Sequence, residues 1–129
     1  MSILRVNSDG THERVGGTSL GGATFFGLCA LTTQCASFSD ALRLAEEGVA
    51  SNVDLLVSDI YGGDYEEYGL TGGTVAASMG KLIRPDVVST ARPQDVARGI
   101  LDAITNNIVK RQEQSKRGEK TLMGRGGGG

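Results

Sequence analysis

The fold of this chain is decided by residues 14–28, which read Arg-Val-Gly-Gly-Thr-Ser-Leu-Gly-Gly-Ala-Thr-Phe-Phe-Gly-Leu. The glycine-rich first part leads into residues 23–31, which are apolar on nearly all sides and predict a buried helix. Small residues before a helix N-terminus suit phosphate binding, because backbone N–H groups and the helix dipole point there. The spacing matches neither the GxxxxGK[ST] nor the GxGxxG fingerprint. Local pattern alone therefore favours a plain tight turn.

Two short runs before this stretch predict a β-hairpin. Residues 2–7 and 11–15 flank Ser-Asp-Gly at positions 8–10. Asp-Gly between two alternating runs is a hairpin signal, because both residue types tolerate a positive φ.

Downstream, the sequence predicts mainly helices. Ser37 and Ser39 offer N-caps for a helix over about 39–47, and a second helix runs from Ser51 or Asn52 to Ile60. Residues 61–73 are predicted as a loop, and residues 74–83 as a helix that Pro85 ends. The last predicted helix begins at Pro93. Its apolar residues recur at helical spacing: Val96, Ile100, Leu101, Ile104 and Ile108.

Charge divides the 129 residues unevenly. Residues 1–109 carry 7 basic and 13 acidic side chains, whereas residues 110–129 carry 6 and 2. The acidic body argues against nucleic-acid binding, which needs a basic face. Residues 110–129 lack apolar periodicity and end in four glycines, so they are expected to be a disordered tail after a domain over 1–109.

Other features restrict the cellular setting. No apolar stretch approaches the roughly 18–20 residues of a membrane span, and the N-terminus lacks the apolar core of a signal peptide. Cys29 and Cys35 are not spaced as CxxC, and His12 has no second metal ligand at useful spacing. A reducing, cytoplasmic location without metal or redox chemistry is the expectation.

Two groups could bind a ligand. Arg14 precedes the glycine loop, where it is either a clamp for a carboxylate or phosphate or a solvated strand-end arginine. Tyr61, Tyr65 and Tyr68 share a glycine-broken loop, where they line a groove or an interface, or else cap the core. The residues alone favour the solvated arginine for Arg14 and leave the choice open for the tyrosines.

Three blocks resemble the eukaryotic-type pantothenate kinase family in the same order. They are residues 14–28, residues 59–65 (Asp-Ile-Tyr-Gly-Gly-Asp-Tyr) and residues 104–108 (Ile-Thr-Asn-Asn-Ile). The resemblance covers about residues 2–108. It implies an α/β fold, namely an incomplete actin-like, sugar-kinase-like lobe, and ATP-dependent phosphorylation of pantothenate as the first step of coenzyme A synthesis. Mg²⁺-bound ATP, feedback inhibition by acetyl-CoA and a homodimer of the full-length enzyme are implied with it.

The resemblance also assigns roles to residues. Ser2 and Arg14 match positions that contact pantothenate or acetyl-CoA, and Tyr61 and Tyr65 match tyrosines of the pantetheine channel. Leu70, Val75 and Ala76 match positions in that neighbourhood. The nucleotide or phosphate loop would comprise Gly17, Thr18, Ser19, Gly21 and Gly22.

No residue of this chain matches the family's general base or its N-terminal phosphate-binding turn. The chain is therefore expected to be a fragment that positions ligands and is inactive alone. The alternative is a non-catalytic module of the same family, which binds coenzyme A or mediates dimerisation.

Overall fold

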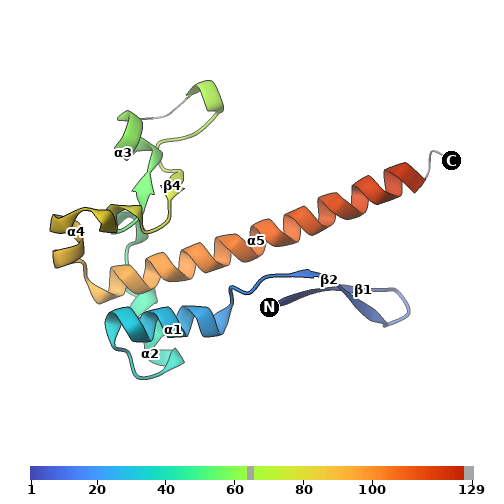
Figure 1. Ribbon diagram of the computed structural model, residues 1–129, viewed down its shortest axis with the longest axis horizontal. Coiled ribbons are helices and arrows are strands. Elements are labelled where there is room, and N and C mark those ends of the chain that lie inside the picture. The colour runs from blue at the N-terminus through green and yellow to red at the C-terminus, as the bar shows by residue number, and fades with distance from the viewer. Residues whose placement is uncertain (64–65, 127–129) are drawn as a thin grey trace. The chain divides into compact units, whose positions relative to one another are not determined.

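The computed structural model describes residues 1–63 and 66–126, without the side chains of Glu66, Ser115 and residues 117–126. Within it the chain forms two compact units. The first unit combines Met1–Thr24 with the chain from Ile104 onward, and the second is Phe25–Ala103. Figure 1 shows mainly helices with two small sheets, each of two strands, so the structure is a mixed α/β arrangement.

The first unit begins with the predicted hairpin. Strands β1 (Ser2–Val6) and β2 (His12–Gly17) pair antiparallel, with a register shift between Ile3 and Leu4. At the turn Gly10 has φ of 86°, and the Asp9 carboxylate accepts a 2.9 Å bond from the Thr11 N–H. The Asp-Gly signal is therefore confirmed, because the glycine adopts the left-handed conformation that it favours.

Two helices follow, and their burial differs from what the sequence suggests. Helix α1 spans Gly22–Thr33 and α2 spans Phe38–Glu46, the latter capped by the Ser37 hydroxyl, which accepts from the Asp40 N–H at 3.1 Å. The prediction that α1 is buried all round is wrong. Phe25 and Cys29 are its buried residues, whereas Leu31 is 78% exposed, because the described residues cover one face only.

The segment after α2 contains strands where helices were predicted. Residues 50–61 form a 3-10 turn (η1, Ala50–Asn52), strand β3 (Leu55–Leu56) and helix α3 (Val57–Tyr61), which ends at left-handed Gly62. Residues 75–83 form strand β4 (Val75–Ala77) and a 3-10 turn (η3, Gly80–Ile83) in place of a helix. The reason is long-range, since Leu55 pairs with Ala77 and Leu56 with Val75 in an antiparallel sheet.

Two further short elements lie before and after β4. A 3-10 turn (η2, Glu66–Tyr68) lies within the predicted loop of residues 61–73. Pro85 was expected to end a helix, but it begins α4 (Pro85–Thr90), because the first helical turn tolerates a residue without an N–H.

The long helix α5 begins at Pro93 as predicted and runs to Gly126. Val96, Ile100 and Ile104 of its predicted apolar face are buried. The structure continues the helix through 110–126, where we expected disorder. Lys, Arg, Gln and Glu are strong helix formers even without an apolar stripe, and the prediction considered only that stripe. Residues 127–129 of the expected tail lie outside the described residues.

The core of the second unit joins α2 to the first turns of α5. Asp95 is buried and accepts bonds from the Val49 N–H at 2.9 Å and from the Asn52 amide at 3.0 Å. A side chain at Gly48 would overlap the carbonyl oxygen of Gln94. Glycine is therefore required where the end of α2 meets α5.

Candidate ligand-binding residues

The predicted ligand-binding residues fall into two groups, one in each unit. Ser2, Arg14 and the glycine loop belong to the first unit, and Tyr61, Leu70, Val75 and Ala76 belong to the second. Tyr65 lies outside the described residues.

In the first unit, the hairpin brings Ser2 and Arg14 together. The Arg14 Nε–H donates to the Ser2 hydroxyl at 3.2 Å. Both side chains are exposed, and the remaining guanidinium donors of Arg14 have no carboxylate partner among residues 1–63 and 66–126. A fork of donors held at one end by a serine is suited to a carboxylate or phosphate.

The glycine loop is held by bonds within the chain. The Thr18 N–H donates to the Met1 carbonyl at 2.9 Å, and the Leu20 N–H donates to the Thr18 hydroxyl at 3.1 Å. The Gly21 N–H donates to the Thr24 hydroxyl at 3.2 Å. These three loop N–H groups are therefore engaged already. The donors left for an anion are those of the first turn of α1, which helical geometry provides with no acceptor.

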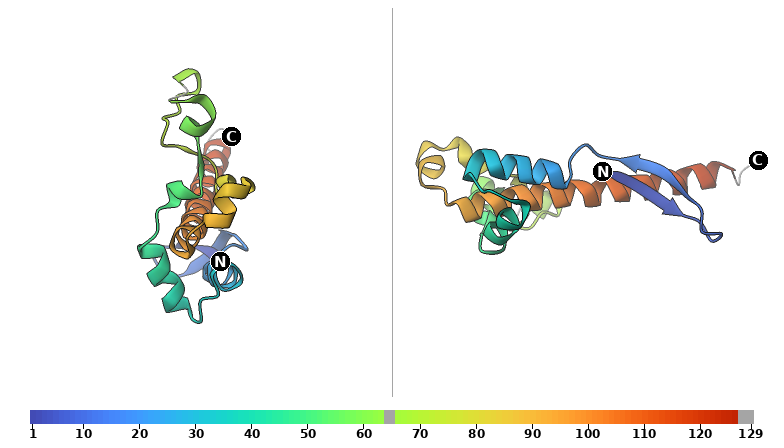
Figure 2. Two further views of the ribbon diagram at one scale, coloured as in Figure 1. Left: turned by 90° about the vertical axis from the view of Figure 1, so that its left-hand side faces the viewer. Right: turned by 90° about the horizontal axis from the view of Figure 1, so that it is seen from below.

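Two residues of α5 contact this loop, and we did not predict either. The Thr18 hydroxyl donates to the Asn107 side-chain oxygen at 2.9 Å. Arg111 donates to the Gly17 carbonyl through Nε at 3.1 Å and Nη2 at 2.9 Å. Figures 1 and 2 show the hairpin beside the second half of α5. Asn107 and Arg111 are four residues apart, so the sequence already places them on one helix face. No local pattern, however, indicates what that face contacts.

In the second unit, the other predicted residues surround one small sheet. Helix α3 is tied to the segment before β4, because the Val57 N–H donates to the Thr74 carbonyl at 2.9 Å and the Ser58 N–H donates to the Gly72 carbonyl at 3.0 Å. The predicted residues here are exposed: Tyr61, Leu70, Val75 and Ala76. All four therefore lie exposed on the chain from α3 to β4, within residues 61–76.

Charged side chains support the same sheet. The Asp59 carboxylate accepts from the Leu56 N–H at 2.7 Å and lies 3.3 Å from the Lys81 ammonium. The bond from the Leu56 N–H lowers the pKa of Asp59; desolvation opposes this shift, and Lys81 adds to it. Asp54 is buried, and desolvation raises its pKa despite a 2.8 Å bond from the Met79 N–H. These groups stabilise backbone turns.

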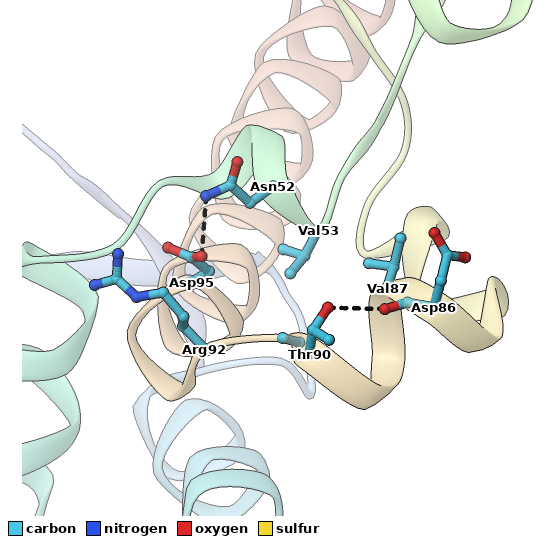
Figure 3. A pocket seen from close by; sticks show the side chains of 8 residues that line it. Asn52, Val53, Asp86, Val87, Thr90, Arg92 and Asp95 are labelled. Atoms are coloured by element: carbon cyan, nitrogen blue, oxygen red, sulfur yellow. Dashed lines mark hydrogen bonds between the residues drawn. The ribbon is translucent and has the colours of Figure 1, made fainter.

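A pocket of about 310 Å³ lies between η1, α4 and the start of α5, as Figure 3 shows. Asp95 on its wall is bonded to Asn52, and the Thr90 hydroxyl donates to the Asp86 carbonyl at 2.7 Å. No predicted ligand-binding residue lines this pocket. Because its buried carboxylate is already satisfied, we assign it no function.

The described residues contain no group of three or more His, Cys, Asp or Glu side chains arranged to hold a metal ion. Among them, no helix combines the length and the apolar character that crossing a bilayer requires.

Comparison with known proteins identifies relatives. A family model described as Fumble matches residues 1–114. The chain is 46% identical over 110 residues to pantothenate kinase 1 of Arabidopsis thaliana, covering 84% of this chain and 29% of that protein. It is 46% identical over 111 residues to pantothenate kinase of Schizosaccharomyces pombe, with 84% and 28% covered. For pantothenate kinase 2 of Oryza sativa subsp. japonica the identity is 44%, with 84% and 12% covered. The chain thus spans less than a third of each of these relatives.

Proposed function

The chain belongs to the Fumble family, and from that premise we propose that it is part of an ATP-dependent pantothenate kinase. Such an enzyme phosphorylates pantothenate to 4'-phosphopantothenate, the first step of coenzyme A synthesis. The curated names of its relatives support this reaction. The structural observation that carries the proposal is the contact between Arg14 and Ser2, the two residues expected to bind pantothenate or acetyl-CoA.

In this proposal the chain positions ligands and supplies no catalytic residue. Arg14 retains charged donors that suit the pantothenate carboxylate or a polar group of acetyl-CoA. Mg²⁺-bound ATP, which supplies the phosphoryl group, would contact the start of α1 at Gly22. The turn before this helix is formed by Gly17, Thr18, Ser19 and Gly21. No described residue is assigned to Mg²⁺.

The β3–α3–β4 unit would serve the pantetheine part of acetyl-CoA. The exposed ring of Tyr61 and the apolar Leu70, Val75 and Ala76 offer the mixed surface that an amide-containing chain requires. An actin-like lobe, a homodimer of the complete protein and a cytoplasmic location belong to the same proposal.

A second candidate is a non-catalytic module that binds coenzyme A or mediates dimerisation. It is favoured by one observation, the contact between Arg14 and Ser2, which would bind ligand without taking part in catalysis. A chimera separates the two candidates. Residues 1–108 replace the matching segment of the Arabidopsis relative, and ATP-dependent phosphorylation of pantothenate is measured.

Turnover within about tenfold of the parent enzyme supports the kinase proposal, since a segment adapted to catalysis preserves transition-state positioning. An inactive chimera that folds and still binds acetyl-CoA favours the binding module. A chimera that folds and binds neither pantothenate nor acetyl-CoA contradicts both candidates. The unmodified Arabidopsis protein and an Arg14→Ala chimera serve as controls.

A further inference from the structure

Two side chains of α5 hold consecutive residues of the glycine loop. Asn107 and Arg111 are four residues apart, so they lie on the same face of the helix. Asn107 accepts from the Thr18 hydroxyl, and Arg111 donates twice to the Gly17 carbonyl. Each contact joins residues about ninety positions apart in the sequence, and the two contacts meet at the neighbouring residues Gly17 and Thr18.

Gly17 connects these contacts to Arg14. A Cβ atom built on Gly17 would lie 2.5 Å from Arg14 Nη2 and 2.8 Å from the Met1 carbonyl oxygen. The guanidinium of Arg14 therefore rests against Gly17, in space that any other side chain would fill. Its position depends on where the Gly17 backbone is held.

Asn107 acts on the loop through a hydroxyl group. The Thr18 hydroxyl donates to Asn107, and its oxygen accepts from the Leu20 N–H at 3.1 Å. A hydroxyl whose proton is committed to one acceptor presents its lone pairs in fixed directions, and linked bonds strengthen one another. Asn107 thus orients the bond that closes the turn before α1.

The charged side chain of Arg111 bonds to the backbone. Among the described residues Arg111 has no carboxylate partner, and two of its donors are directed to a neutral carbonyl. Both donors reach one oxygen, so the guanidinium constrains the orientation of the Gly17 peptide.

We propose that Asn107 and Arg111 are positioning residues, which fix the Gly17–Thr18 peptide and thereby the guanidinium of Arg14. The proposal rests on the ligand-binding role proposed above for Arg14. It assigns a role to two residues of α5 to which the resemblance assigns none.

The experiment uses the full 129-residue chain and two readouts. Hydrogen exchange of the Leu20 amide reports on the loop, and the Asn7 amide, which donates to Thr11 across the hairpin turn, is the internal reference. An NMR titration with acetyl-CoA, which follows the Arg14 Nε–H signal, reports on ligand binding. The variants are Arg111→Ala and Asn107→Ala, with Lys110→Ala as the matched loss of charge on the same helix.

Arg111→Ala and Asn107→Ala are expected to accelerate Leu20 exchange by about tenfold, the effect of losing one hydrogen bond. They should weaken acetyl-CoA binding by about the same factor. Lys110→Ala should behave like the unmodified chain. Asn7 exchange should not change in any variant.

Equal Leu20 exchange in Arg111→Ala and Lys110→Ala would overturn the proposal. Equal acceleration of Leu20 and Asn7 would also overturn it, because the effect would then be a general loss of hairpin stability. If the unmodified chain does not bind acetyl-CoA, the ligand role of Arg14 fails, and the exchange data still decide whether Arg111 and Asn107 hold the loop.

Discussion

Arg14 is the residue on which ligand binding is expected to depend most. In a complete enzyme carrying this segment, Arg14→Ala should weaken both pantothenate use and acetyl-CoA inhibition by about 1.5–3 kcal/mol, the range for hydrogen bonds to a charged group. Folding should survive, because the side chain is exposed and contacts the Ser2 hydroxyl. The measurement is KM for pantothenate and the inhibition constant, beside a melting curve.

Arg5→Ala is the matched control, since Arg5 lies on the same hairpin and pairs with Glu13. If Arg14→Ala keeps the pantothenate KM and the inhibition of the parent, Arg14 binds no ligand and is a solvated residue at the end of a strand.

The two thiols should differ in reactivity. Burial, and secondarily the nearby Cys35, raise the pKa of Cys29 to about 11. At pH 8 about one Cys29 side chain in a thousand would be the reactive thiolate. Iodoacetamide should therefore label the half-buried Cys35 much faster than Cys29 in the folded chain. Mass spectrometry of peptides checks this, and similar rates in 6 M guanidinium chloride are the control. Equal labelling in the folded chain would contradict the burial of Cys29.

Asp54 gives stability a distinctive pH dependence. Its pKa in the folded chain is raised above 3.8, chiefly by burial, so the folded state holds this proton more tightly than the unfolded state. Its contribution to stability is therefore greatest below 3.8 and falls as pH rises through the folded pKa. Asp54→Asn keeps an oxygen for the Met79 N–H. This variant should be more stable than the parent only at pH values above the folded pKa of Asp54.

Urea unfolding of both proteins between pH 3 and pH 7 measures the difference. A difference that stays constant over this range would mean that Asp54 titrates as it does in the unfolded chain. Asp59→Asn is the opposite control. The pKa of Asp59 is lowered, so that variant should lose stability above 3.8 and approach the parent as the pH falls.

At the scale of elements, the contact between the end of α2 and α5 depends on Gly48. A Cβ there would overlap the Gln94 carbonyl oxygen and lie 2.8 Å from Arg98 Cβ, so the helices would have to separate. Gly48→Ala should destabilise the chain by about 1–3 kcal/mol, as overpacking does. Denaturant unfolding measures the effect.

Gly27→Ala provides a matched control within α1, because a Cβ at Gly27 meets no atom within 4 Å. Alanine favours the helix there, so the control should gain about 0.5–1 kcal/mol. Equal effects of the two substitutions would show that the close approach at Gly48 is not a determinant of stability.

At the scale of the whole molecule, the isolated 129-residue chain is expected to show no pantothenate kinase activity. Phosphoryl transfer needs a general base and groups that hold the phosphates, and no residue here matches the family's base. An ATP-consumption assay with pantothenate measures this, with a complete relative as the positive control. Turnover above the no-enzyme background, in a preparation free of host kinases, would contradict the expectation.

Several elements follow from local physical chemistry and were therefore predictable. Asp9-Gly10 supplies a turn because glycine accepts a positive φ, Ser37 caps α2 because its hydroxyl reaches the Asp40 N–H, and Pro93 begins α5 because it needs no N–H partner. The Arg14–Ser2 contact does not follow from the turn alone, because a register shift between Ile3 and Leu4 places Ser2 opposite Gly17.

Other features exist only because distant segments meet. Strands β3 and β4 have two and three residues, which is too few for an alternating pattern. They pair through hydrogen bonds between segments about twenty residues apart, where the sequence predicts two helices. The contacts of Arg111 with Gly17 and of Asn107 with Thr18 span about ninety residues. Each side chain is unremarkable in its own segment, and its role arises from tertiary packing, which brings a donor to a particular backbone oxygen.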